Sequence, residues 1–163
     1  MRLRTGELRY DLDEDRFETT TGTGRTIVFG DDAAANEYSP VESVVVALAA
    51  CSAMDVISIL RKKRQVVDSY RIEVSAEQRD EYPQVLTSVE VTHIVEGTVV
   101  LEQAVRRAVE LSATKYCPVS AMISAGATEV RHLFRMRCTG AEPRVAEGEV
   151  IVTGPFRPPT VVP

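Results

Sequence analysis

Residues 39–64 read SPVESVVVALAACSAMDVISILRKKR, and this stretch predicts one long helix. Ser39 is a favourable N-cap, the proline after it fits the first helical position, and a glutamate follows three residues after Ser39 as in a capping box. The cations at 62–64 suit a helix C-terminus. Residues 44–51 are apolar on every side of such a helix, so we expect it to be buried on all faces. Its polar ends and short apolar run argue against a membrane span.

The composition indicates a soluble chain with room for a real core. The chain has 163 residues, of which 44% are hydrophobic and 26% charged. Its net charge of −5 argues against a nucleic-acid partner, because phosphate binding needs a clustered positive surface. No apolar segment follows the first six residues, so no secretory signal is expected and a cytoplasmic location is favoured.

The order of elements predicts an α+β fold with a largely antiparallel sheet. Turn residues and alternating apolar positions predict a meander of short strands before the long helix, and a hairpin of two long strands after it. The expected strands are 7–13, 16–21, 25–29, 68–81, 86–100 and 128–137. Two further helices are expected at 101–114 and 119–124.

The last part of the chain differs in composition. Residues 143–163 hold five of the eight prolines, and proline interrupts regular structure. We therefore expect a domain at 1–139 followed by a Pro/Gly-rich extension at 140–163, with at most one short strand at 149–153.

Three cysteines are too few for a disulfide framework, so each is a buried residue, a ligand or a catalytic thiol. There is no CxxC or HExxH motif, and only His93 and His132 could add ligands, so neither zinc nor another cofactor is expected. Any one cysteine could also be a small apolar filler, and Cys138, at the end of a predicted strand, fits that description.

Local chemistry separates the other two thiols. Cys117 precedes a proline at the predicted N-cap of a short helix, where free amides favour a negative sulfur, and Lys115 is nearby. Cys51 has Asp55 one helical turn later, and a neighbouring carboxylate disfavours a thiolate. Local chemistry alone therefore predicts that Cys117 is the more acidic thiol.

The long helix with small residues around Cys51, the hairpin, and the sequence KYCPVSAMI at 115–123 together resemble the osmotically inducible protein C and organic hydroperoxide resistance (OsmC/Ohr) family. The resemblance implies an OsmC-like fold, an intertwined homodimer in which strands of both chains wrap around two central helices. It also implies a thiol peroxidase that reduces organic hydroperoxides, with Cys51 as the peroxidatic and Cys117 as the resolving cysteine. A dithiol reductant would then open the Cys51–Cys117 disulfide.

Members of this family activate the first cysteine with an arginine of the N-terminal meander and a glutamate directly after the proline. The resemblance makes Arg25 the candidate arginine. The position after the proline is Val41 here, and the carboxylate is Glu42, nine residues before Cys51. Nine residues turn an ideal helix by half a turn beyond whole turns, so Glu42 and Cys51 lie on opposite sides.

This departure resembles a less characterised branch of the family and leaves a second function open. The same dimeric fold could act as a redox sensor or bind a small apolar ligand, with little peroxidase turnover. A third reading leaves both cysteines inert.

Overall fold

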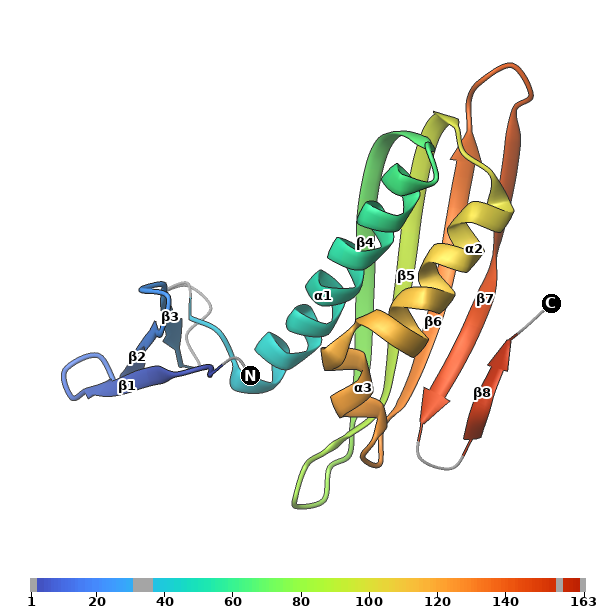
Figure 1. Ribbon diagram of the computed structural model, residues 1–163. Helices are drawn as coiled ribbons and strands as arrows, with labels where there is room; N and C mark the ends of the chain where they lie inside the picture. Colours follow the sequence, from blue (N-terminus) through green and yellow to red (C-terminus); the bar gives the residue numbers. More distant parts are fainter. Residues whose placement is uncertain (1–2, 31–36, 155–156, 162–163) are drawn as a thin grey trace. The chain divides into compact units, whose positions relative to one another are not determined.

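The computed structural model describes residues 3–30, 37–154 and 157–161, and for 157–161 the backbone alone. The chain divides into two compact units, Met1–Val44 and Val45–Pro163. Figure 1 shows the three-stranded sheet of the first unit and the larger sheet with its helices in the second.

The smaller unit is the predicted antiparallel meander. Its strands are β1 (Gly6–Asp11), β2 (Arg16–Thr21) and β3 (Thr26–Phe29), paired in chain order. The turn before β2 has Asp15 at φ 52°, and the turn before β3 has Gly24 at φ 77°, a left-handed conformation that glycine adopts without strain.

The larger unit is built on a five-stranded sheet in the order β4-β5-β6-β7-β8. These strands are β4 (Val66–Gln78), β5 (Leu86–Val99), β6 (Glu129–Cys138), β7 (Arg144–Gly154) and β8 (Arg157–Val161). The predicted β4–β5 hairpin is confirmed. All neighbours are antiparallel except β5 and β6, which are parallel because the helices between them carry the chain back to the same end of the sheet.

The helices lie on one face of this sheet (Figure 1). They are α1 (Pro40–Lys62), α2 (Glu102–Leu111), the π-helical turn η2 (Ser112–Tyr116) and α3 (Pro118–Ser124). The long predicted helix is confirmed. It ends in a Schellman motif, in which Arg64 has φ 57° and the Gln65 N–H donates to the Leu60 carbonyl at 3.1 Å. The helix expected at 101–114 changes after Leu111 to a π-helical turn, which leads directly to Cys117.

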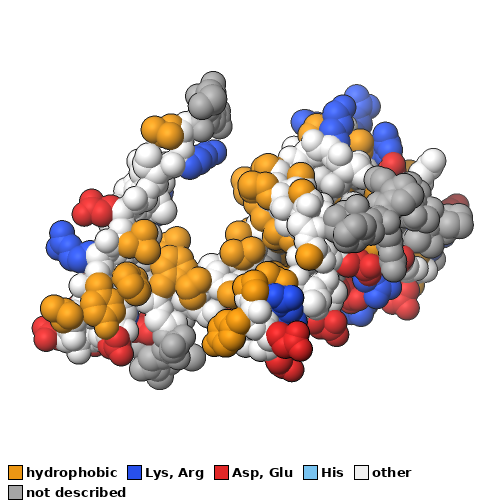
Figure 2. All heavy atoms as spheres, turned by 90° about the horizontal axis from the view of Figure 1, so that it is seen from below, with side chains coloured by type: hydrophobic (Ala, Val, Ile, Leu, Met, Phe, Trp, Pro, Cys, Tyr) orange, Lys and Arg blue, Asp and Glu red, His pale blue; other side chains and the backbone are white. Residues whose placement is uncertain are grey.

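One face of α1 carries the contacts to the core. Leu48, Ser52, Val56 and Leu60 recur every four residues and are completely buried. The expectation that α1 is buried on all faces is wrong within one chain, because Val46 is 58% and Met54 74% exposed. Figure 2 shows hydrophobic side chains gathered at the surface of the larger unit.

The argument that α1 is too polar or short to span a membrane is also corrected. Its most apolar 18-residue window has a mean hydropathy of 2.2, which is enough by length and composition alone. The buried stripe that α1 presents to the sheet of its own chain is what a core helix has.

The C-terminal region contributes more regular structure than its prolines suggested. In place of one short strand at 149–153, β7 runs over eleven residues and β8 pairs with it. Val150, Ile151 and Val152 of β7 are buried. The prolines lie outside β7, so they do not interrupt its pairing with β6. The boundary after residue 139 stays a prediction, although both strands extend the main sheet.

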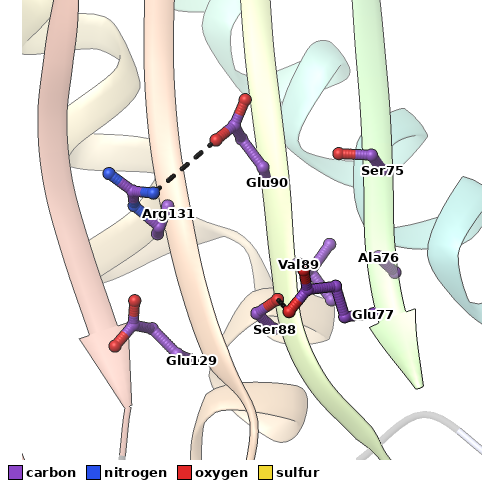
Figure 3. A pocket seen from close by; sticks show the side chains of 8 residues that line it. All are labelled: Ser75, Ala76, Glu77, Ser88, Val89, Glu90, Glu129 and Arg131. Atoms are coloured by element: carbon purple, nitrogen blue, oxygen red, sulfur yellow. Dashed lines mark hydrogen bonds and ion pairs between the residues drawn. The ribbon is translucent and has the colours of Figure 1, made fainter. Parts of the chain in front are cut away.

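The sheet face without helices is charged. Arg131 is paired with Glu149 at 2.6 Å, and Arg137 with Glu96 at 2.7 Å. A shallow hollow on this face has Arg131, Glu90 and Glu129 among its lining residues (Figure 3). In this hollow the guanidinium of Arg131 is ion-paired with Glu90 as well as with Glu149.

Candidate active site

The fold brings two of the four predicted site residues together. Cys51 is half-buried on α1, and Cys117 is buried at the junction of η2 and α3. Both sulfurs and a carboxylate oxygen of Asp55 lie within 4.8 Å of one another. Both thiols are free. A disulfide bond is about 2.0 Å long, so this pair could close by a local adjustment.

Local structure explains each position. Cys51 and Asp55 are four residues apart on α1 and therefore share one side of the helix. The N–H of Cys117 donates to the Ser112 carbonyl at 2.9 Å, which closes η2. The Cys117 sulfur caps α3 by accepting from the Ser120 N–H at 3.3 Å.

Burial decides the acidity of Cys117. Burial raises the pKa of the Cys117 thiol to about 12, although the N–H groups of Ser120 and Val119 act in the opposite direction. The neighbouring Cys51 raises it further. The helix cap was expected to lower the pKa of Cys117. The pKa is raised instead, because desolvation of the thiol outweighs the effect of the cap. The ammonium of Lys115 lies 5.5 Å from the ring centroid of Tyr116.

Asp55 is the carboxylate of this site. Partial burial raises its pKa, and a hydrogen bond donated by the Ser112 hydroxyl at 3.2 Å lowers it by a smaller amount. Ser112 therefore holds one oxygen of Asp55 beside the two thiols.

A network of buried polar groups extends from Asp55 to the sheet. Ser112 is 3.2 Å from the Ser52 hydroxyl, which is 3.3 Å from Nε2 of His93. On the other side of the imidazole, Nδ1 of His93 is 2.8 Å from the Tyr70 hydroxyl. Burial, and secondarily Asp55, raises the pKa of Tyr70.

A second histidine lies beside the first. His132 on β6 stacks on His93 with ring centroids 6.3 Å apart, and its Nε2 is 3.3 Å from the Ser120 hydroxyl. Burial lowers the pKa of His93 to about 3 and that of His132 to about 4, so both rings are neutral at pH 7. Among the described side chains Nδ1 of His132 has no hydrogen-bond partner.

Sequence reasoning considered these histidines only as zinc ligands. Each histidine stands at the same every-second position as the buried apolar residues of its strand, on β5 and on β6, and this pattern could have placed both on the inner face.

Arg25 and Glu42, the other two predicted site residues, both belong to the smaller unit. Arg25 lies in the loop between β2 and β3, where its N–H donates to the Thr21 hydroxyl at 3.1 Å. It belongs to the smaller unit, and its reach to Cys51 stays a prediction. Glu42 is exposed in the first turn of α1, and its catalytic role also stays a prediction.

Cys51, Asp55 and Cys117 also form, within the described ranges, the cluster whose donor atoms are close enough to hold a metal. A search for short zinc motifs in the sequence could not find this cluster, because its donors come from distant segments of the chain. Two of its three donors are the thiols that a disulfide would consume, and we assign no metal to it.

Cys138 packs against the larger core cluster, as expected of a filler residue. Its sulfur lies 3.5 Å from the Thr98 carbonyl. Hydrogen bonds from the N–H groups of Val100 and Gly140 lower its pKa. Thiol measurements on this chain therefore need a Cys138→Ser background.

Residues 30–132 match the family model described as OsmC-like protein. The chain belongs to the OsmC-like family. Protein YhfA of Escherichia coli K12 is 36% identical over 116 residues, which cover 71% of this chain and 86% of YhfA.

Solved structures agree with this OsmC-like assignment. A hypothetical protein from Aquifex aeolicus is 30% identical, with a TM-score of 0.75, over 85% of this chain and 98% of its own. An organic hydroperoxide resistance protein from Elizabethkingia anophelis shares the fold, with a TM-score of 0.62 and 11% identity over 81% and 94% of the two chains. Solved proteins whose names refer to osmotic stress and to organic hydroperoxide resistance therefore share the fold of this chain.

Proposed function

We propose that this OsmC-like protein is a thiol peroxidase that reduces organic hydroperoxides. The observation that carries the proposal is the approach of two free thiols, from helices far apart in sequence, to within 4.8 Å. Cysteines that only fill space in a core are usually surrounded by apolar groups. Here a carboxylate oxygen of Asp55, hydrogen-bonded to Ser112, lies beside both thiols.

The proposed reaction begins at Cys51. Its thiolate attacks the terminal peroxide oxygen, the O–O bond breaks, the alcohol leaves, and Cys51 becomes a sulfenic acid. Cys117 then attacks the Cys51 sulfur, forming the disulfide and releasing water. A cellular dithiol restores both thiols by exchange.

Burial supports this division of roles. Cys51 is half-buried and so within reach of a peroxide, whereas Cys117 is 3% exposed and its sulfur is engaged as a helix cap. A buried thiol that meets only its neighbour is suited to the second step.

The surroundings favour an organic substrate. Met54 on α1 and Met122 on α3 are exposed, and Leu48 and Val119 pack near the thiols in one apolar cluster. An apolar hydroperoxide would gain from burying its alkyl part there, by about 25 cal/mol for each Å² removed from water.

We also propose a cytoplasmic homodimer. Val46 and Met54 leave apolar surface exposed on α1, and a second copy of α1 would cover it. In the proposed dimer Arg25 and Glu42 are candidates for activating Cys51. A reducing compartment would keep the pair in its dithiol form between turnovers.

Steady-state turnover tests the proposal. Purified Cys138→Ser protein, with a dithiol in excess, is expected to consume cumene hydroperoxide over many cycles, and Cys51→Ser is expected to abolish this. In Cys117→Ser the Cys51 sulfenic acid has no disulfide partner in the chain, so consumption should fall to the rate at which the dithiol reduces the sulfenic acid directly. Equal consumption by Cys138→Ser and Cys51→Ser would refute the proposal.

The second candidate function is a redox sensor or a binding module for a small apolar ligand. The observation that favours it is that Val41 stands at the family's glutamate position, while the carboxylate beside the thiols is Asp55. A sensor would form one Cys51–Cys117 disulfide per chain and show no continued peroxide loss in the presence of the dithiol.

A further inference from the structure

The resolving thiol has a chemical difficulty that the two-cysteine scheme does not solve. The attacking species in disulfide formation is the thiolate. Because burial raises the pKa of the Cys117 thiol, very little of it is ionised at pH 7. Attack by Cys117 therefore needs a group that takes its proton as the new bond forms.

Asp55 is placed to do this. Its carboxylate lies within 4.8 Å of the sulfurs of both Cys51 and Cys117, a distance that one water molecule can bridge. Ser112 donates to one carboxylate oxygen at 3.2 Å and fixes the group in that position. An acceptor close to both sulfurs can serve the attacking thiol and the leaving group in turn.

The other titratable groups around Asp55 are poorer acceptors. On β4 the Tyr70 hydroxyl is bonded to His93, and on β5 His93 is held by Tyr70 and Ser52. His132 on β6 is held by Ser120. Both imidazoles are completely buried, and their lowered pKa values make them weak bases. Partial burial raises the pKa of Asp55, which makes its carboxylate a better base than an exposed aspartate.

We propose that Asp55 is the proton acceptor for Cys117 when Cys117 attacks the sulfur of oxidised Cys51. With a sulfenic acid as the target, the proposal rests on the peroxidase function. The Cys117 proton moves to the carboxylate and the S–S bond forms. The S–O bond of Cys51 breaks, and the leaving hydroxide takes the proton from Asp55 and departs as water. Asp55 ends the step unchanged, and no further oxidant or reductant is needed.

This role gives the carboxylate beside the thiols a purpose. A fixed negative charge next to Cys51 disfavours a thiolate, so as a bystander Asp55 would hinder the chemistry. As a proton acceptor for the closing step it accelerates the reaction of the thiol that cannot ionise by itself.

Ring closure can be tested without a peroxide. An aromatic disulfide reacts with Cys51 to form a mixed disulfide and releases one coloured arylthiolate. Cys117 then closes the ring and releases a second. Stopped-flow absorbance in the Cys138→Ser background follows both phases, and Cys117→Ser identifies the second phase by its loss.

Asp55→Asn is expected to slow the second phase about 100-fold at pH 7, the scale of a positioned general base. Asp55→Glu should recover most of the rate. In Asp55→Asn the second phase should rise about tenfold per pH unit, since hydroxide must then remove the proton. Asp68→Asn, a change of an exposed aspartate on β4, is the matched control and should leave both phases unchanged.

A second phase in Asp55→Asn with the rate and pH dependence of the parent would overturn the proposal, as would a parent that shows no second phase. Thermal unfolding of each variant confirms that it is folded, and the asparagine keeps an oxygen for Ser112. Because no hydroperoxide takes part, failure of this test and failure of the peroxidase assay are separate results.

Discussion

The buried hydroxyl of Ser52 lies 3.3 Å from Nε2 of His93, so a buried polar contact joins α1 to β5 of the main sheet. The same hydroxyl is 3.2 Å from that of Ser112, which in turn donates to Asp55. The packing of the helices and the placement of the candidate proton acceptor therefore depend on one network.

Removing the Ser52 hydroxyl should destabilise the protein. In Ser52→Ala the buried groups of His93 and Ser112 each lose a partner, which costs about 1–3 kcal/mol in the free energy of unfolding. Ser58→Ala, an exposed serine on the same helix, is the control and should change it by less than about 0.5 kcal/mol. Urea denaturation measures both, and equal effects of the two substitutions would contradict this role of Ser52.

Stability should fall as the pH is lowered below about 6.5. In the unfolded chain the histidines take up protons near pH 6.5, whereas in the folded protein His132 does so near 4 and His93 near 3. The unfolded state then binds more protons, so each histidine removes about 1.4 kcal/mol per pH unit until its folded pKa is reached. Urea midpoints at pH 7, 6 and 5 measure this. A stability independent of pH over that range would show that the rings are not held neutral.

Cys117 should be the slowest cysteine to react with a small alkylating reagent at pH 7. Its thiol is buried and its raised pKa leaves little thiolate, so its alkylation is expected to be about 100-fold slower than that of Cys51. Peptide mass spectrometry after timed exposure to iodoacetamide gives the rate at each site. Comparable rates at the two cysteines would mean that Cys117 is accessible in solution.

A charge on the exposed side of α1 should weaken the proposed dimer. Met54→Glu is expected to produce monomers in light scattering at micromolar concentration, because the carboxylate would be buried without a partner. Val145→Glu is the matched control, since Val145 on β7 is 76% exposed and Met54 74%. If Met54→Glu and the parent have the same mass in solution, this side of α1 is not the interface.

Local signals in the sequence predict the helices and strands well. Ser39 and Glu42 mark the start of α1, and alternation of apolar and polar residues predicts the β4–β5 hairpin. The parallel pairing of β5 with β6 depends on where the intervening helices turn, which no short pattern records. The length of β7 depends on its pairing with β6, and this outweighs the nearby prolines.

The candidate site was only partly predictable for the same reason. The resemblance singled out Cys51 and Cys117, but desolvation of Cys117 appears only when distant segments pack around it. Local reasoning saw Asp55 as a hindrance to Cys51. Its position beside Cys117 and Ser112, 57 residues further along the chain, is a product of the tertiary fold.

The most direct test of the central claim is to map the disulfide formed by a hydroperoxide. Reduced Cys138→Ser protein is treated with one equivalent of cumene hydroperoxide, alkylated, digested without reductant and analysed by mass spectrometry. The account predicts a Cys51–Cys117 linked peptide in most of the protein, and a trappable Cys51 sulfenic acid in the Cys117→Ser variant. Recovery of both cysteines as alkylated free thiols, with the hydroperoxide unconsumed, would contradict it.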